Sequence, residues 1–302
     1  MTTQQHVAPA IGSAEQLWGH GAMLLFALLI SVSFTLGDLA VPHIAPGPLT
    51  VARFALAVVV MGLIAAPALR RQHLQAPWRY VILGGLMAGY FVLMFEALDR
   101  TDPISTGAIF TLTPIMSAIF GWVLLRQVTT GSMAIALALA GCGALWVIFR
   151  GDVVALTSFN FGVGEQIFLV GCSLHAFYTP LVRLTRRDEP VLVYTFGMLC
   201  GGLSVTFAYS ARETLALDWA ELPPIAWAGI VYLGVATTAI TALLVQFATL
   251  RLPSAKVMAY GYLVPTFVIV EEGLLGHGWV AATVWLGVAG TIAGLLILLR
   301  EG

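Results

Sequence analysis

Apolar stretches of about 20 residues recur along the whole chain, from Gly21 to Leu299. Of the 302 residues, 59% are hydrophobic and only 10% are charged, whereas a soluble domain carries about 25% charged residues. So few charged groups cannot cover the surface of a soluble protein of this size, whereas a run of about 20 apolar residues can cross a bilayer as a helix. The sequence therefore predicts an all-α integral membrane protein.

Charges, prolines and glycines divide these stretches into ten expected spans. The spans are placed at 20–40, 49–68, 79–98, 104–125, 130–149, 162–182, 190–210, 225–248, 255–275 and 279–299. The stretches are continuously apolar rather than alternating, which argues against the strands of a membrane barrel. Residues 1–19 are expected to form an N-terminal cytoplasmic tail, because Met1–Leu17 lacks the Lys and Arg of a cleaved signal peptide.

The loop charges test the number of spans and orient the chain. With the N-terminus inside, the inner side holds Arg70, Arg71, Arg79, Arg126, Arg183, Arg186, Arg187, Arg251, Lys256 and Arg300, and the outer side holds Arg53, Arg100, Arg150 and Arg212. Lys and Arg resist translocation, so the side that carries more of them is normally cytoplasmic. We therefore expect a multi-pass protein of the bacterial inner (plasma) membrane with both termini in the cytoplasm.

The sequence repeats itself at a period of about 150 residues. Phe95-Glu-Ala-Leu98 and Thr111-Leu-Thr-Pro-Ile115 resemble Phe247-Ala-Thr-Leu250 and Tyr262-Leu-Val-Pro-Thr266. Each copy ends in a glycine-rich span, with Gly141 and Gly143 in the first and Gly287, Gly290 and Gly294 in the second. The chain is therefore divided into two five-helix repeats, 20–150 and 151–302. Since five is an odd number, the second repeat must enter the membrane from the opposite side.

Inverted repeats of this kind enclose a substrate site between the two halves near the middle of the membrane. The architecture and the two short cores around Pro114 and Pro265 resemble the drug/metabolite transporter superfamily, whose repeat is often called the EamA domain. Within that superfamily the chain is most similar to the amino acid exporters, the bacterial aromatic amino acid exporter among them. The resemblance implies a ten-helix exporter of small metabolites. The superfamily often has an acidic residue after the fourth helix of each copy, where this chain has Gln127 and His277.

Ionisable residues inside spans are costly and usually face a cavity or one another. Five of them fall toward the outer ends of the expected spans: Asp38, Arg53, Glu96, Glu271 and Glu272. The plainest interpretation is that these side chains reach the headgroups or the outer vestibule. Asp38 and Arg53 could also form an ion pair that joins the first two spans at the outer mouth.

His175 and Gln246 lie deeper and are the stronger candidates for substrate contacts. His175 is in the middle of the sixth span, with Tyr178 one turn later on the same face. It could bind substrate or titrate with pH, or simply bond to a backbone carbonyl. Gln246 offers a donor and an acceptor, near Thr238 and Thr241 in the eighth span. Further candidate ring residues flank the two prolines: Tyr90, Phe91, Phe95, Phe110, Tyr260 and Tyr262.

Pro114 and Pro265 each fall inside a span, where a proline removes a backbone donor and bends the helix. Equivalent bends in both halves would widen a central cavity, so we interpret the two prolines as hinges of the gates. The glycine-rich fifth and tenth spans are expected to pack closely and to serve as a scaffold.

The remaining motifs favour a carrier over other classes of protein. The sequence contains no HExxH, GxSxG or Gly-Lys phosphate loop, which argues against an enzyme, and no filter-like loop that would indicate a channel. The three cysteines are separated and form no metal-binding pattern, so no cofactor or metal is expected. We expect a monomer or homodimer in the bilayer that carries an amino acid-like solute and binds no nucleic acid. A multidrug or cationic-solute transporter is the alternative, and the choice between proton coupling and facilitation stays open.

Overall fold

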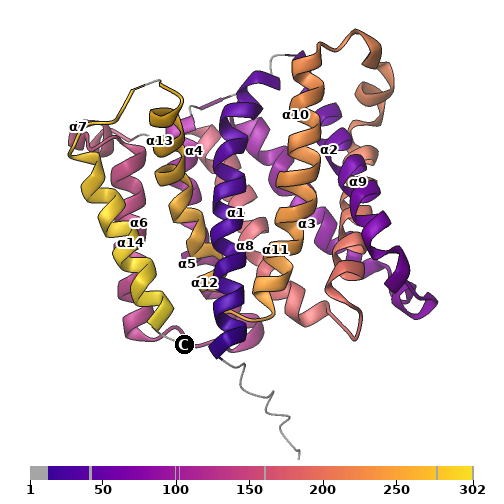
Figure 1. The fold of residues 1–302 in the computed structure, drawn as a ribbon, viewed down its shortest axis with the longest axis horizontal. Coiled ribbons are helices and arrows are strands. Elements are labelled where there is room, and N and C mark those ends of the chain that lie inside the picture. The colour runs from indigo at the N-terminus through magenta and orange to yellow at the C-terminus, as the bar shows by residue number, and fades with distance from the viewer. Residues whose placement is uncertain are drawn as a thin grey trace, which may run out of the picture.

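The computed structural model of the chain describes residues 13–40, 43–98, 100–101, 103–159, 161–276 and 278–300, with only the backbone described at 13, 33–40, 98, 103 and 104. Every regular element in this part of the chain is helical (Figure 1). Nine of its stretches are long and apolar enough to cross a membrane, and a tenth, shorter apolar helix covers Val284–Arg300. The prediction of a ten-helix membrane protein is confirmed.

The spans of the first half follow the expected order. They are α1 (Ser13–Ala40), α2 (Pro46–Ala65), α3 (Trp78–Leu98), the pair α4 (Pro103–Phe110) and α5 (Thr113–Leu125), and α6 (Gly131–Ile148). Two short 3-10 helices, Ala66–Ala68 and Arg71–Leu74, connect α2 to α3. The first helix begins at Ser13 rather than near residue 20, so part of the expected tail is helical.

The second half begins with a short surface helix, α7 (Val153–Thr157). Its spans are α8 (Val163–Thr185), α9 (Val191–Ala216), an eighth span of three segments, a ninth span of three segments, and α14 (Val284–Arg300). The eighth span consists of α10 (Pro224–Gly234), a π-helix (Val235–Ile240) and α11 (Thr241–Thr249). The ninth span consists of α12 (Ser254–Ala259), a 3-10 turn (Tyr260–Leu263) and α13 (Val264–Leu274). A 3-10 turn at Trp219–Glu221 lies between α9 and α10.

The two halves run in opposite directions through the bundle. In Figure 1 the chain rises along α1 and descends along α8, and the C-terminal end of α14 lies at the same face as the start of α1. The packing repeats across the halves as well: α3 packs against α8, and the equivalent third span of the second half, α10 with α11, packs against α1. The inverted arrangement that follows from two five-span repeats is thus present.

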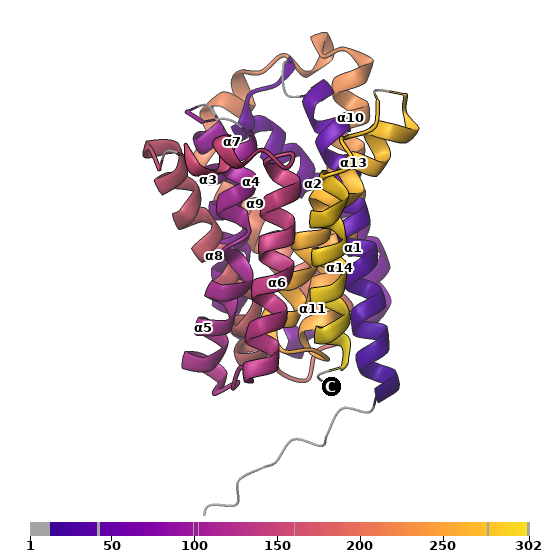
Figure 2. The same ribbon diagram turned by 90° about the vertical axis from the view of Figure 1, so that its left-hand side faces the viewer.

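Close packing of small residues holds α6 against α14 at one end of the molecule (Figure 2). A Cβ atom added to Gly143 would lie only 2.5 Å from the carbonyl oxygen of Gly287, and one added to Gly294 would lie 2.6 Å from that of Ala136. Backbones approach this closely only where side chains are absent. The two glycine-rich helices therefore form a tightly packed pair, as the sequence predicts.

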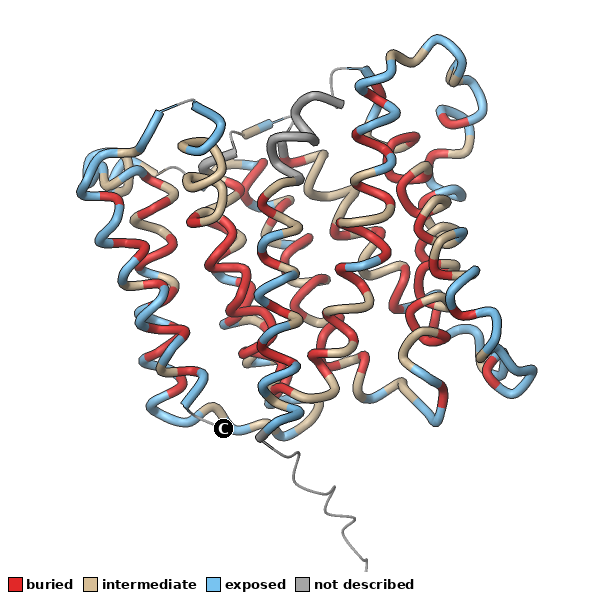
Figure 3. Tube along the Cα trace, viewed as in Figure 1, coloured by how far each residue is buried: buried red, intermediate tan, exposed pale blue. Residues whose placement is uncertain are grey.

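Apolar side chains cover the outside of the bundle as well as its interior. Large hydrophobic residues such as Leu63, Ile135 and Leu286 are exposed, which suits a surface that faces lipid chains. Figure 3 shows the buried positions concentrated on the helices at the centre of the molecule. Of the nine long candidate spans, the eighth is the most enclosed. In its apolar 18-residue stretch 61% of the residues are buried, against 28% in that of α1. The eighth span therefore lies in the interior of the bundle.

The two prolines begin helices instead of bending them. The fourth span is interrupted after Phe110 and resumes as α5, with Pro114 in its first turn, and the ninth span resumes as α13 with Pro265 in the same position. Proline suits the first turn of a helix because the amide hydrogen that it lacks has no partner there. Each half therefore has a broken span at the place where the sequence predicts a bend.

Candidate functional site

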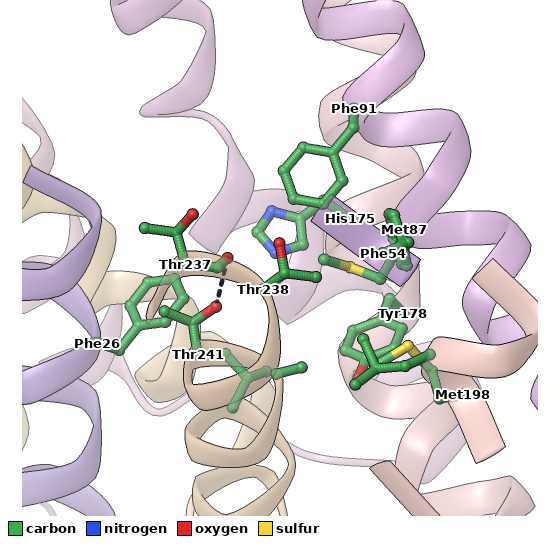
Figure 4. Close-up of a pocket in the computed structure, with 13 residues that line it drawn as sticks. Phe26, Phe54, Met87, Phe91, His175, Tyr178, Met198, Thr237, Thr238 and Thr241 are labelled. Carbon is green, nitrogen blue, oxygen red and sulfur yellow. Dashed lines mark hydrogen bonds between the residues drawn. The ribbon is translucent and has the colours of Figure 1, made fainter. Parts of the chain in front are cut away.

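A narrow cavity lies between the two halves, in the centre of the bundle (Figure 4). Six spans contribute side chains to it, three from each half, so neither half encloses it alone. The lining residues are Phe26, Phe54, Met87, Phe91, His175, Tyr178, Met198, Leu199, Thr237, Thr238, Thr241, Ala242 and Val245. The volume open to the centres of water molecules is about 30 Å³, which is room for about two waters. An amino acid can enter only if the helices around the cavity move apart.

The polar part of the lining comes from the eighth span. Thr237, Thr238 and Thr241 lie on its cavity side, and the hydroxyl of Thr241 donates to the carbonyl oxygen of Thr237 over 2.8 Å (Figure 4). Thr237 and Thr238 belong to the π-helix, where the wider turn brings neighbouring side chains to one side. Such π-helical turns occur frequently at functional sites.

His175 lies within a stack of rings at the edge of the cavity. Its ring centroid is 4.6 Å from that of Tyr90 on α3 and 6.0 Å from that of Phe110 on α4, and both pairs are stacked. His175 is buried, and its Nδ1 atom has no hydrogen-bond partner among the described residues. Three of the residues suggested by the sequence therefore meet here, with an imidazole nitrogen unpaired beside the cavity.

Tyr178 and Gln246, which the sequence also suggests, form a hydrogen-bonded chain below the histidine. The Gln246 side-chain amide donates to the Tyr178 hydroxyl over 3.1 Å, and its oxygen accepts from the Thr195 hydroxyl over 3.0 Å. Tyr178 lines the cavity, whereas Gln246 is fully buried behind it. Gln246 therefore positions the tyrosine ring and does not itself face the cavity.

Arg53 lies deeper than the sequence suggests. Its side chain is 3% exposed and points into the bundle, where Nε donates to the Thr238 hydroxyl over 2.8 Å. The Nη2 atom donates to the hydroxyl and carbonyl oxygens of Thr237, and the guanidinium carbon lies 4.1 Å from the centroid of the Phe91 ring. The expectation that Arg53 reaches the outer headgroups is not met, because the side chain turns toward the π-helix instead of along its own helix.

Burial of this cation requires compensation. A charged side chain near the centre of a span costs roughly 2.5–3.5 kcal/mol by insertion measurements. The ion pairs found among the described residues join Arg79 to Glu189, Arg100 to Glu96 and Arg251 to Glu15, and none includes Arg53. The side chain of Asp38, which the sequence suggests as its partner, lies outside the described residues.

Of the ring residues suggested by the sequence, Tyr90, Phe95, Phe110, Tyr260 and Tyr262 are absent from the cavity lining, and the last two bond to other helices. The Tyr260 hydroxyl bonds to Nδ1 of His20 on α1 over 2.8 Å, and the Tyr262 hydroxyl donates to the Thr111 carbonyl oxygen over 2.9 Å. Both tyrosines lie in the 3-10 turn of the ninth span, which directs their rings toward neighbouring helices. Both join helices and lie outside the lining of this central cavity, and Tyr260 lines a separate apolar cavity with Trp18 and Phe267.

The remaining ionisable residues of the spans also lie away from the cavity lining. Glu96 pairs with Arg100 over 2.8 Å at an exposed position, and Glu271 accepts from the Ser31 hydroxyl over 2.7 Å. Gln127 accepts from the backbone amide of Ser254 over 3.1 Å and thereby caps the start of α12. His277 lies outside the described residues, as do Asp99 and Asp102 in the loop before α4.

Several lining residues were not singled out from the sequence, namely Phe26, Phe54, Met87, Met198 and Thr237. The apolar ones give no signal, because they look like every other core residue of a helical bundle. The Thr237-Thr238 pair could have indicated the cavity from the sequence, since two consecutive hydroxyls inside an apolar span place at least one of them on the interior face. Within the described residues no group of three or more metal-binding side chains is present.

Comparisons with known proteins show what the chain is similar to. A sequence model described as the EamA-like transporter family matches residues 17–149 and 162–300. "Uncharacterized transporter YyaM" of Bacillus subtilis (strain 168) is 24% identical over 259 residues, which cover 84% of this chain and 85% of that protein. One solved crystal structure superposes with a TM-score of 0.76 at 17% identity, over 94% of this chain and 96% of that chain, and at this identity it shows the fold alone.

Proposed function

Because the chain belongs to the EamA-like transporter family, we propose that this multi-pass membrane transporter exports small metabolites across the bacterial inner membrane, namely amino acids, with apolar or aromatic side chains favoured. The observation that carries the proposal is the cavity between the two halves. It combines aromatic and methionine side chains with a patch of threonine hydroxyls and one imidazole. Such a lining suits a solute that is apolar at one end and polar at the other.

The chemistry of the lining argues against the competing substrates. No Asp or Glu is among the described residues that line the cavity, whereas a cationic drug would be best held by a carboxylate. A nucleotide sugar would require several cations for its phosphates. Arg53 is the sole Lys or Arg among the described residues that contact the threonines of the lining. The lining therefore favours amino acids over cationic drugs and nucleotide sugars.

Alternating access is the proposed mechanism. The cavity lies between inverted repeats, and each repeat has a broken span in which a proline begins the second helix. Two related breaks give each side of the membrane its own gate, and Pro114 and Pro265 are proposed as their hinges. The distribution of Lys and Arg in the sequence supports a cytoplasmic position for both termini. The carrier is proposed to act as a monomer or homodimer, without a cofactor.

Transport by the purified protein in liposomes tests the proposed substrate class. Labelled phenylalanine would be offered together with unlabelled Trp, Phe, Thr and Met, nucleotide sugars, or cationic drugs. We expect Trp, Phe and Met to compete and the other two classes to leave uptake unchanged. Competition by a cationic drug, with none by the amino acids, would refute the proposal in favour of a multidrug transporter.

His175 is the proposed titratable group if transport is coupled to protons. It borders the cavity and has an unpaired ring nitrogen among the described residues. Concentrative uptake driven by a pH gradient would indicate coupling, whereas simple equilibration would indicate facilitated diffusion. His175→Ala is expected to slow transport and flatten its pH dependence, and unchanged transport at every pH would exclude this residue from the mechanism.

A further inference from the structure

We propose that Arg53 binds the carboxylate of the transported solute, and that the π-helix of the eighth span holds the guanidinium in position for it. This inference rests on the proposed function and specifies the chemistry that its substrate must carry. It starts from a cation that is almost completely buried inside the bundle and has no described carboxylate partner.

The hydrogen bonds around Arg53 leave one edge of its guanidinium unused. A guanidinium has five N–H donors. Nε donates to Thr238, and Nη2 donates to the two oxygens of Thr237 over 3.2 and 3.4 Å. Nη1 has no hydrogen-bond partner among the described residues. The two donors on this atom, together with the weakly bonded Nη2, form the fork that a carboxylate binds through both of its oxygens.

The threonines around Arg53 are themselves fixed in direction. The hydroxyls of Thr237 and Thr238 both donate to the carbonyl oxygen of Leu233, over 3.0 and 2.7 Å. Because each hydroxyl has a single proton, their lone pairs are left to accept from Arg53. The bond from Thr238 reaches back five residues, which is the spacing of a π-helix. The irregular turn therefore supplies two aligned acceptors without placing a negative charge beside the cation.

The residues that hold Arg53 line the cavity, whereas Arg53 itself lies directly behind them and is not part of the lining. Phe91, Thr237 and Thr238 contact the guanidinium, and the same three side chains surround the opening seen in Figure 4. The guanidinium carbon lies over the Phe91 ring, 4.1 Å from its centroid, so a carboxylate must approach Arg53 from another side. We expect a carboxylate that binds Nη1 to leave the solute's side chain among the apolar lining residues, which include Phe26, Phe54 and Met198.

The arrangement makes a substrate carboxylate a requirement and excludes solutes that are purely cationic. An amine without a carboxylate would bring a second positive charge next to a buried one, which is unfavourable at low dielectric. An amino acid supplies a negative charge that no described residue provides, and its departure leaves the cation without a carboxylate among the described residues. Arg53 is therefore a specificity-determining residue for the class of solute, and the ring-lined part of the cavity selects within that class.

Uptake of matched compounds by wild-type protein in liposomes tests the inference without any variant. The probes are L-phenylalanine, L-phenylalaninamide and phenethylamine, which share the ring and the amino group and differ at the carboxylate. We expect L-phenylalanine to be preferred by at least about tenfold, the range of one charge-assisted pair. Equal uptake of the acid and the amide would overturn the role of Arg53 while leaving amino acid transport intact. Uptake of none of the three would instead count against the proposed function.

Variants at position 53 provide the second arm of the test. Arg53→Gln is expected to reduce L-phenylalanine uptake and remove the preference over the amide, and Arg53→Lys is expected to retain a preference because the charge remains. If Arg53→Gln fails to fold, Thr238→Val, which removes the acceptor of Nε, should weaken the preference. Asp38→Asn serves as a control. If it reproduces the effect of Arg53→Gln, Arg53 serves an internal ion pair and the inference is wrong.

Discussion

The hydroxyl of Tyr262 donates a hydrogen bond to the carbonyl oxygen of Thr111 over 2.9 Å, and the two residues hold equivalent places in the two repeats. Each lies three residues before a proline, Pro265 in one case and Pro114 in the other. Both positions belong to the interruption of a broken span. The bond therefore links the two interruptions directly.

Removal of this bond should destabilise the protein. Tyr262 is 2% exposed, and Tyr262→Phe removes its hydroxyl and leaves the Thr111 carbonyl without that donor. A buried polar group left unpaired costs about 1–3 kcal/mol. Thermal unfolding in detergent should therefore shift to lower temperature. Tyr209→Phe, at an exposed position on α9, is the control and should leave the midpoint unchanged. Equal midpoints for both variants would contradict the structural role of the bond.

The hinge hypothesis predicts slower transport when either proline is replaced. Pro114→Ala and Pro265→Ala supply the missing backbone donor, so the interrupted spans can join into continuous helices. We expect a protein that folds normally and exchanges substrate several-fold more slowly, measured as counterflow in liposomes. Transport at the wild-type rate in both variants would exclude the prolines as hinges.

The sequence predicts the number and direction of the spans because lipid imposes a strict requirement. Every span must be long and apolar, and Lys and Arg gather on one side. The same periodicity places His175 inside the membrane and brings it into the set of candidates. The prolines mark the interruptions at Phe110 and Tyr260, although the sequence alone suggests bends rather than new helices.

The depth and direction of individual side chains could not be predicted in the same way. Arg53 lies toward one end of α2, and its position along the helix suggests a headgroup contact. Its direction depends on the acceptors offered by the π-helix, which no local pattern in the sequence announces. Tyr260 and Tyr262 resemble the other ring residues in sequence, yet a single 3-10 turn directs them toward α1 and the fourth span. Tertiary contacts decide such positions.

Two adjacent glycines on α3 are expected to respond in opposite ways to replacement by alanine. A Cβ atom at Gly84 would lie 2.1 Å from the backbone nitrogen of Gly202 and 2.4 Å from the carbonyl oxygen of Met198 on α9. Backbone atoms cannot yield locally, so Gly84→Ala must push the two helices apart. At Gly85 the nearest contact is ordinary, 3.6 Å to the Val205 side chain.

The effects of the two substitutions can be measured as folding yield and as the midpoint of thermal unfolding in detergent. Gly84→Ala should cost at least about 1–3 kcal/mol, the usual range for overpacking, and reduce the yield of monodisperse protein. Gly85→Ala should be neutral or stabilising, since alanine is favoured over glycine in a helix by about 1 kcal/mol. Similar behaviour of the two variants would show that α3 and α9 are not in the contact described.

The ion pair between Arg79 and Glu189 should contribute far more than the pair between Arg100 and Glu96. Both have a separation of 2.7–2.8 Å, but the first pair has 3% of each side chain exposed and the second has 45% and 42% exposed. Arg79 at the start of α3 also donates to the Thr185 carbonyl at the end of α8. The buried pair therefore joins α3, α8 and the loop before α9 at the face that holds both termini. Glu189→Gln leaves the buried cation uncompensated and should cost about 3–5 kcal/mol, whereas Glu96→Gln should cost about 0–1 kcal/mol, because water already screens that pair. Thermal unfolding of the two variants in the same detergent measures the difference, and equal midpoints would mean that water reaches Arg79 in the folded protein.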